Sequence, residues 1–383
     1  MSDDALPELD ALEGAPHPRQ TPRVFGHDRA EAVFLDAHAS GRLHHAWLLA
    51  GPRGIGKATL AWRIARFLLA EPAAEPDGLF GAPPPPATLD LPADHPVLRR
   101  TLALSEPRLL LLRRVWNTKA KPPRPQAVIT VEEARRLRDF FALSAADGGR
   151  RVVIVDAADE MNPQAANALL KLLEEPPEGA VLLLVAHQPS ALLPTIRSRC
   201  RILRLDPLSP DDLSAALVQA GLPAEEAPPA LAALAGGSVG AALGLARLDG
   251  LARYDEILRL FGTLPRLDRT RALKLADSVA GRAGDSAARL DLLLGLLDLF
   301  LARLARAAIA GPPAVAASPD EAAVFARLAP HPGAGRHWAG LQAELGARGR
   351  HGRAVNLDPA ALVLDIVLRI ERAAAGVAAE GPA

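Results

Sequence analysis

The sequence predicts an α/β domain built on a parallel sheet, followed by an all-helical part. Short apolar runs at 46–50, 151–156 and 180–186 alternate with segments of helical periodicity, which is the pattern of a parallel sheet covered by helices on both faces. From about residue 209 the helical patterns continue without strand-like alternation. A length of 383 residues suits two or three domains, so each part has room for its own core.

Composition and charge exclude several classes of protein. Lys and Arg together number 44, as do Asp and Glu, so no overall field draws the chain to nucleic acid or to a membrane. Cys200 is the only cysteine, which excludes an internal disulfide and a thiolate zinc site. The N-terminus has no apolar signal core, and charged residues interrupt the Leu-rich stretch 290–304. We therefore expect a cytoplasmic chain with no membrane partner.

The first elements can be placed in chain order. Residues 1–22 lack periodicity and carry few apolar groups to offset the entropy of ordering a backbone, so we expect a flexible leader. A helix is expected at 30–39 and the first strand at 46–50. After a Gly-rich turn, residues 57–69 place apolar side chains at helical spacing, so strand, turn and helix follow one another directly.

Residues 71–125 are rich in proline, and we interpret them as an insertion that leaves the core. Within the insertion, residues 97–125 contain eight basic residues and one acidic residue, a local net charge of +7. A solvated loop is the ordinary explanation, and contact with nucleic acid is the alternative. The candidate DNA contacts are Arg113, Arg114, Lys119 and Lys121.

Regular alternation resumes after residue 125. A helix is expected at 131–143 and another from Asn162, because Asn followed by Pro has the chemistry of a helix N-cap and first helical position. Two consecutive prolines end this second helix after Glu175.

Residues 51–57 match the phosphate-binding pattern G-x-x-x-x-G-K between a predicted strand and a predicted helix, the context that gives this motif its meaning. Glycines let backbone N–H groups surround phosphate oxygens, the helix N-terminus adds partial positive charge, and the lysine neutralises the outer phosphates. The candidate residues are Gly51, Gly54, Gly56 and Lys57. An accidental Gly-rich turn is the alternative interpretation.

The magnesium side of this site is incomplete. Ala58 stands where a hydroxyl normally holds Mg²⁺, and Thr59 is one residue late, a rotation of about 100° on a helix. Asp156, at the end of an apolar strand, is the candidate carboxylate that orients Mg²⁺. Ala157 follows it, where many P-loop ATPases carry a Glu that activates water. If ATP binds, we expect feeble hydrolysis, with Mg²⁺ present only together with ATP.

Three motifs occur in a fixed order: the loop 51–57, the segment 167–177 (NALLKLLEEPP) and Ser198-Arg199-Cys200. Together they resemble the clamp-loader branch of the AAA+ ATPases. The resemblance implies a RecA-like AAA+ P-loop domain at 23–207, a small helical lid domain at 208–249, an all-α collar domain at 250–375 and a flexible tail at 376–383. It also implies a sensor Arg in the lid, where this sequence has Gly240.

The resemblance further implies a role in the bacterial replicative clamp loader, within the DNA polymerase III holoenzyme. Its expected partners are the gamma/tau and delta subunits, with the sliding clamp and primer-template DNA reached through the complex. Arg199, supported by Ser198 and Cys200, would act in trans as an arginine finger at a neighbour's ATP. A polymerase class label would follow from complex membership alone. The alternative is an autonomous P-loop ATPase that relies on Lys57 and Asp156.

Some positions depart from the family pattern. Family members commonly carry a four-cysteine zinc module after the P-loop helix, and residues 71–125 contain no cysteine, so we expect no zinc. His187 stands at the usual sensor position, and we interpret it as a hydrogen-bonding spacer. His44 and His45 are expected to face opposite sides of a strand and so not to form a metal pair.

Overall fold

The computed structural model describes residues 6–12, 14–71, 86–142, 149–226, 228–280 and 286–380. The chain divides into two compact units, which are described separately. The first comprises Met1–Leu222 with Gly237–Gly240, and the second comprises Pro223–Gly236 with Ala241–Ala383. The predicted lid at 208–249 is thus shared between the two units, and the division into three domains stays a prediction.

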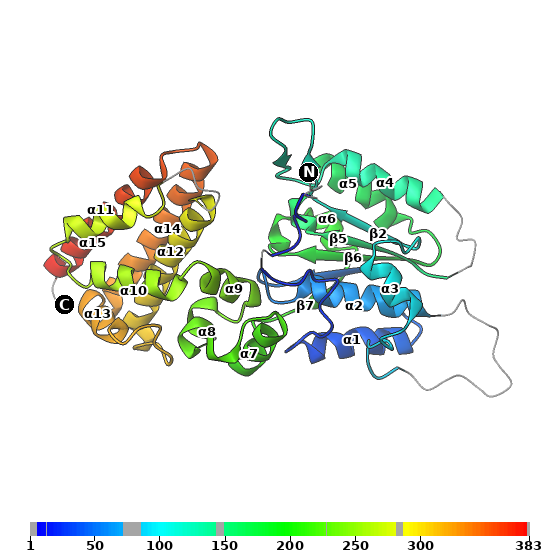
Figure 1. Ribbon diagram of the computed structural model, residues 1–383, viewed down its shortest axis with the longest axis horizontal. Helices are drawn as coiled ribbons and strands as arrows, with labels where there is room; N and C mark the ends of the chain where they lie inside the picture. The colour runs from blue at the N-terminus through cyan, green and yellow to red at the C-terminus, as the bar shows by residue number, and fades with distance from the viewer. Residues whose placement is uncertain are drawn as a thin grey trace, which may run out of the picture. The chain divides into compact units, whose positions relative to one another are not determined.

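The first unit is built on a parallel sheet with the strand order β2-β5-β6-β1-β7 (Figure 1). The sequence predicted the three central strands with the bounds that the structure gives them. The strands are β1 (Ala46–Ala50), β2 (Leu109–Arg113), β5 (Arg151–Asp156), β6 (Ala180–Ala186) and β7 (Arg201–Arg204). Because every pair in this sheet is parallel, all five strands end at the same edge.

Two helical layers cover the sheet and bury alternate residues of its strands (Figure 1). Trp47 and Leu49 pack with α1 (Asp28–Ala39) and α2 (Lys57–Ala70) on one face. Leu48 packs on the other face, with α4 and α5. Further helices of this unit are α4 (Val131–Ala142), α5 (Pro163–Glu174), α6 (Pro194–Arg197) and α7 (Pro210–Gln219), with short 3-10 turns η1 (Ala158–Glu160) and η2 (Pro189–Ala191). The turn η3 (Ala224–Glu226) belongs to the second unit. The side chain of Asn162 caps α5 as predicted, accepting a hydrogen bond from the N–H of Ala165 at 2.8 Å.

We expected residues 71–125 to form an insertion that leaves the core, and this prediction was wrong for part of the segment. Residues 109–113 form the edge strand β2, which pairs with β5 from Leu109 to Arg113. Helix α3 (Pro96–Leu102) precedes this strand, and a hairpin of β3 (Trp116–Asn117) and β4 (Arg124–Pro125) follows it. Four consecutive leucines form the apolar run of β2, but the proline-rich sequence on both sides made this strand hard to recognise. Residues 72–85 lie outside the described part.

The expectation of a flexible leader at 1–22 is also corrected where the structure describes it. Trp116 donates its Nε1–H to the carbonyl of Pro7 at 2.7 Å, and Arg113 pairs with Glu8 at 3.0 Å. His17 is buried, with its ring edge against Trp62. Basic and aromatic side chains of the domain therefore compensate for the apolar groups that this segment lacks.

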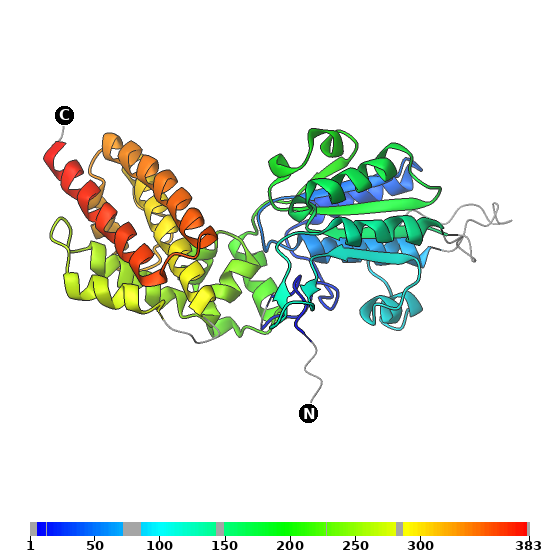
Figure 2. The same ribbon diagram turned by 90° about the horizontal axis from the view of Figure 1, so that it is seen from above.

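The second unit is helical throughout its described residues (Figure 2). Its helices are α8 (Pro229–Ala235), α9 (Val239–Arg247, whose first two residues belong to the first unit), α10 (Gly250–Phe261), α11 (Arg269–Asp277), α12 (Ser286–Ala310), α13 (Glu321–Leu328), α14 (Pro332–Ala354) and α15 (Pro359–Glu380). Helix α15 continues through residues 376–380, so the predicted flexible tail at 376–383 is wrong for these residues. Among the described residues, no single helix has the length and apolarity of a membrane span, although the bent pair α8 and α9 reaches them jointly.

A buried carboxylate organises the second unit. The Glu321 side chain is fully buried and receives Arg303 at both oxygens, at 2.7 and 2.8 Å. The hydroxyl of Tyr254 donates to it at 2.6 Å and the N–H of Ala317 at 2.8 Å. Burial acts to raise the pKa of Glu321, but these donors outweigh it and hold the pKa below its ordinary value. Four donors thus hold the carboxylate in its ionised form.

Replacing Glu321 by Ala should lower the free energy of unfolding of the helical unit by about 3–5 kcal/mol, because Arg303 is left buried without its counterion. Tyr254→Phe removes one hydrogen bond at the same carboxylate and should cost about 1 kcal/mol. Urea denaturation followed by circular dichroism measures both. Equal losses in the two variants would contradict this account.

Candidate nucleotide-binding site

The predicted phosphate loop and Asp156 lie at the edge where the parallel strands end. The loop 51–57 follows β1, Asp156 ends β5 and His187 follows β6, which are neighbouring strands in the sheet. The carboxyl ends of parallel strands are where open α/β sheets bind ligands. The fold therefore brings these three sequence-predicted features together.

Backbone geometry in the loop requires glycine. Gly54 and Gly56 have φ values of +76° and +103°, a region that side chains disfavour. Gly56 is also the N-cap residue of α2 and has no side chain to cap the first N–H groups of that helix. The first turn of α2 is thus available to an anion, as phosphate loops require.

Lys57 is folded back onto its own loop. The side chain is buried, and its ammonium donates to the carbonyls of Gly51, at 2.8 Å, and Pro52. Burial lowers the pKa of Lys57 to about 8, against the opposing attraction of Asp156 and Asp159. A phosphate that bound here would have to exchange with these carbonyls for the ammonium.

Asp156 is in an environment that disfavours its charged form. Burial raises its pKa to about 7, and the negative charges of Asp10 and Glu160 add to the effect, while Lys57 and Arg53 oppose it. Divalent cations stabilise ionised carboxylates, so a bound Mg²⁺ would favour the charged form of this side chain.

The two acidic residues after β5 are already engaged. The Asp159 carboxylate accepts the backbone N–H groups of His187, at 3.1 Å, and Gln188, at 2.8 Å. Glu160 pairs with Arg53 of the phosphate loop at 2.9 Å and with Arg114 at 2.7 Å. Both carboxylates therefore hold the loops in place and are poorly available to activate water.

His187 stays neutral at this edge. Burial and then the positive charges of Lys57 and Arg53 lower its pKa to about 4. Its Nδ1 atom is buried without a hydrogen-bond partner in the described part of the chain. Its role as a hydrogen-bonding spacer stays a prediction.

Sequence reasoning missed that residues 238–240 contact the phosphate loop. The Ser238 hydroxyl donates to the carbonyl of Arg53 at 2.9 Å, and the N–H of Gly240 donates to the carbonyl of Gly54 at 3.1 Å. A Cβ atom on Gly54 would lie 2.5 Å from the Ser238 hydroxyl and 2.9 Å from the Gly240 backbone. The absence of a side chain at Gly240 is thus one condition for this close backbone contact.

Thr59 is the third residue of α2 and is partly buried. Ala58 precedes it, so the hydroxyl is rotated by about 100° from the position at which the motif normally holds Mg²⁺. Thr59 therefore lies two residues after the loop lysine, without the orientation of the hydroxyl that normally holds Mg²⁺.

Arg199 lies at the opposite edge of the sheet. It precedes β7, whose first residue is Arg201, and it pairs with Glu174 at the C-terminal end of α5, at 3.1 Å. It also donates to the carbonyl of Thr195 at 3.0 Å, and its side chain is 37% exposed. A five-residue strand separates the two edges by roughly 16 Å, so Arg199 is remote from the phosphate loop of its own chain.

Its neighbours Ser198 and Cys200 have structural contacts. The Ser198 hydroxyl donates to the carbonyl of Thr195 at 3.1 Å. Cys200 packs against the core beneath α5 and α6, and burial raises the pKa of its thiol to about 12, which makes the thiolate inaccessible at neutral pH.

The structure separates the four basic residues proposed to contact DNA. Arg113 pairs with Glu8 and Asp10, and Arg114 pairs with Glu160. Lys119 and Lys121 are exposed in the hairpin loop between β3 and β4. The first two charges are compensated within the unit, so the +7 of the sequence overstates the positive surface.

The argument about the paired histidines was wrong. The rings of His44 and His45 stack at 4.4 Å, because both residues precede β1 and strand alternation does not apply to them. Each ring bonds to a backbone carbonyl, that of Ala46 at 2.9 Å and that of Leu173 at 3.1 Å. Among the described residues, no group of three His, Cys, Asp or Glu side chains could hold a metal ion.

Comparisons with known proteins find similarity to subunits of DNA polymerase III. A family profile described as "DNA polymerase III, delta subunit" matches residues 107–209, which include β2, β5, α5, β6 and Arg199. The chain is 39% identical over 210 residues to the DNA polymerase III subunit delta' of Pseudomonas aeruginosa, covering 54% of this chain and 57% of that protein. Over about half of its length, the chain is similar to delta-prime subunits.

Other relatives include the delta' subunit of Yersinia pestis, 34% identical over 167 residues (44% of this chain, 43% of that one). The gamma/tau subunit of Mycobacterium tuberculosis is 31% identical over 193 residues (48% and 28%). The chain thus aligns with about half the length of the delta-prime relatives. A solved gamma-subunit-related protein of Thermotoga maritima aligns over 89% of this chain and 99% of its own, with 17% identity and a TM-score of 0.38.

The raised pKa of Asp156 predicts a pH-dependent effect of Asp156→Asn. The carboxyl titrates near 7 when folded and near 4 when unfolded, so its ionisation removes stability as pH rises through that interval. The Asn variant should therefore gain more stability relative to the parent at pH 8 than at pH 5, by about 2 kcal/mol. Denaturation at both pH values measures the gain, and a gain independent of pH would rule out the raised pKa.

Proposed function

We propose that this chain is a non-motor subunit of the bacterial replicative clamp loader, within the DNA polymerase III holoenzyme. It helps to load the sliding clamp onto primed DNA and supplies Arg199 to the ATP site of a neighbouring subunit. The observation that carries the proposal is the position of Arg199, partly exposed at the sheet edge opposite its own phosphate loop.

The geometry favours action in trans. Arg199 is held by the Thr195 carbonyl and by Glu174, so its guanidinium is pre-oriented at the surface. A guanidinium presents several N–H groups in a rigid plane that suits phosphate oxygens. When a neighbour's ATP approaches, its phosphates replace Glu174 as the acceptor, and the charge of Arg199 stabilises the transferred phosphoryl group.

The chain's own pocket supports a scaffold role. Ala58 and Ala157 replace the metal-holding hydroxyl and the water-activating carboxylate, and Gly240 replaces the sensor Arg. Asp159 and Glu160, the remaining nearby carboxylates, already bind backbone N–H groups and arginines. ATP would be held by the loop glycines and Lys57, with Mg²⁺ near Asp156, and hydrolysis would be weak or absent.

The partners follow from this role. Gamma/tau subunits would hold the ATP that Arg199 reaches, and delta would complete the loader around the sliding clamp and primer-template DNA. Any direct DNA contact from the 97–125 segment falls to the exposed Lys119 and Lys121. The polymerase activity belongs to the holoenzyme, and a cytoplasmic location accompanies this role.

Arg199→Ala should lower the DNA-stimulated ATPase rate of a reconstituted loader at least about tenfold, because arginine fingers contribute roughly 10³–10⁵ in rate where they have been measured. Arg199→Lys should recover little of the loss, since Lys lacks the planar guanidinium. Arg138→Ala, on an exposed side chain of α4, is the matched control. Unchanged turnover in an intact Arg199→Ala complex would reject the proposed finger.

An autonomous ATPase is the second candidate, favoured by the joint presence of Lys57 and Asp156 at one sheet edge. Under our proposal, the purified chain hydrolyses ATP at close to the background rate, and Lys57→Ala leaves that rate unchanged. Steady-state phosphate release decides between the two. Robust turnover that Lys57→Ala abolishes would favour the autonomous enzyme.

A further inference from the structure

The N-terminal segment 6–12 lies at the same edge as the phosphate loop. Asp10 pairs with Arg113, the last residue of β2, which is opposite Asp156 in the strand register. Leu12 reaches to 3.0 Å from the position that a Cβ on Gly240 would occupy, beside Gly54. The segment therefore lies over the region where the sequence places a nucleotide.

Arg113 is the main attachment of this segment. It ends β2 and is directly opposite Asp156 in the strand register. One guanidinium nitrogen pairs with Asp10 and another pairs with Glu8, at 3.0 Å. The Asp10 side chain is 4% exposed in this position. Glu8 and Asp10 thus both form ion pairs with Arg113, at the end of the sheet where the phosphate loop lies.

Further contacts continue the attachment along the leader. Arg19 pairs with Glu8 at 2.6 Å, and His17 Nε2 lies 3.1 Å from the Asp10 carboxylate. Arg66 of α2 donates to the carbonyl of Arg19, and α2 begins at the phosphate loop. Residues 17–22 are thus anchored on α2, and residues 6–12 are held through the side chains of Glu8 and Asp10 and through the carbonyl of Pro7, which accepts from Trp116.

A triphosphate and this segment offer the same chemistry to Arg113. Guanidinium groups bind carboxylates and phosphates through the same pairs of N–H donors. The carboxylate of Asp10, held at Arg113 opposite Asp156, also adds negative charge at the end of the sheet where the loop lies, and this charge opposes a polyphosphate. Both effects disappear if Glu8 and Asp10 lose their charges.

We propose that residues 6–12 act as an intramolecular anion, with Glu8 and Asp10 filling a phosphate subsite at Arg113, and that a nucleoside triphosphate binds the loop in competition with this segment. The inference rests on the phosphate-loop part of the proposed function and is independent of Arg199.

The test uses the full chain with Glu8→Gln and Asp10→Asn combined, which keeps side-chain size and removes both charges. Fluorescence titration with N-methylanthraniloyl-ATP and Mg²⁺ should show binding about tenfold tighter than in the parent, because two opposing charges are gone. Inorganic tripolyphosphate should displace the probe. Glu178→Gln with Asp211→Asn, on exposed side chains of the same unit, is the charge-matched control and should bind as the parent does.

Equal, measurable affinity in the parent and the Glu8/Asp10 variant would overturn the inference and leave the phosphate loop intact. Binding in neither protein would overturn both. Hydrogen exchange of the parent provides a second readout that needs no variant. Saturating tripolyphosphate should accelerate exchange of residues 6–12 at least tenfold, and unchanged exchange at saturation would also overturn the inference.

Discussion

A parallel sheet buried on both faces confines charged groups to the edges where its strands begin and end, and the arrangement of the first unit depends on this constraint. At the carboxyl edge, Lys57 and Asp156 are both partly desolvated, and burial pushes each toward its neutral form. Their mutual attraction opposes that tendency but does not cancel it. Other charged groups nearby are therefore balanced by opposite charges. Glu160, for example, pairs with both Arg53 and Arg114.

At the same end of the sheet, a residue without a side chain permits closer packing. Residue 240 has no side chain, so its backbone approaches the phosphate loop and donates to Gly54. A long side chain there would have to displace Leu12 or leave the contact. The loop is thus held from within its own unit by the Gly240 N–H and the Ser238 hydroxyl, and neither hydrogen bond depends on a nucleotide.

The sequence predicted the central strands because they are continuous apolar runs buried on both faces, and it predicted α5 because Asn162 and the following proline act locally. The edge strands β2 and β7 are only partly buried, so their sequences resembled a loop and an Arg cluster respectively. Lys57 and Asp156 lie at the same end of the sheet because the strands that precede them are parallel. The pairing of Arg113 with Glu8 joins residues about a hundred positions apart, and local patterns contain no information on such pairs.

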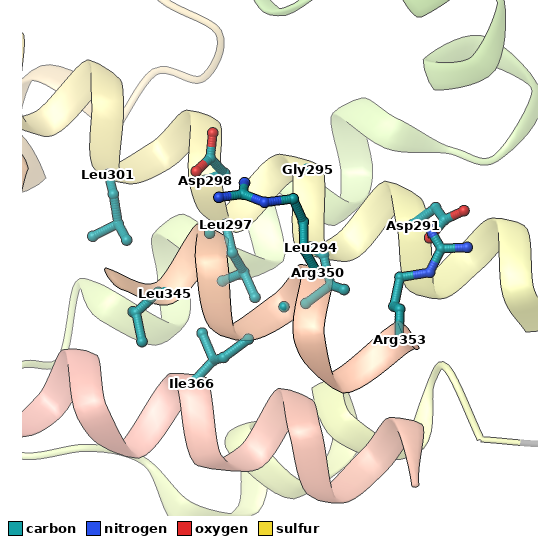
Figure 3. Close-up of a pocket in the computed structure, with 12 residues that line it drawn as sticks. Asp291, Leu294, Gly295, Leu297, Asp298, Leu301, Leu345, Arg350, Arg353 and Ile366 are labelled. Carbon is teal, nitrogen blue, oxygen red and sulfur yellow. The ribbon is translucent and has the colours of Figure 1, made fainter. Parts of the chain in front are cut away.

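The second unit contains a pocket whose charged residues include a compensated ion pair. The groove of about 400 Å³ among α12, α14 and α15 has an apolar floor, with Leu297 and Ile366, and its mouth carries the ion pair of Asp291 with Arg353 (Figure 3). Those charges already compensate one another. Arg199 differs because its pair with Glu174 is exposed, and exposed pairs contribute only about 0–1 kcal/mol. Separating Arg199 from Glu174 therefore costs little, whereas Arg113 is paired with a nearly inaccessible Asp10, and separating that pair requires residues 6–12 to move.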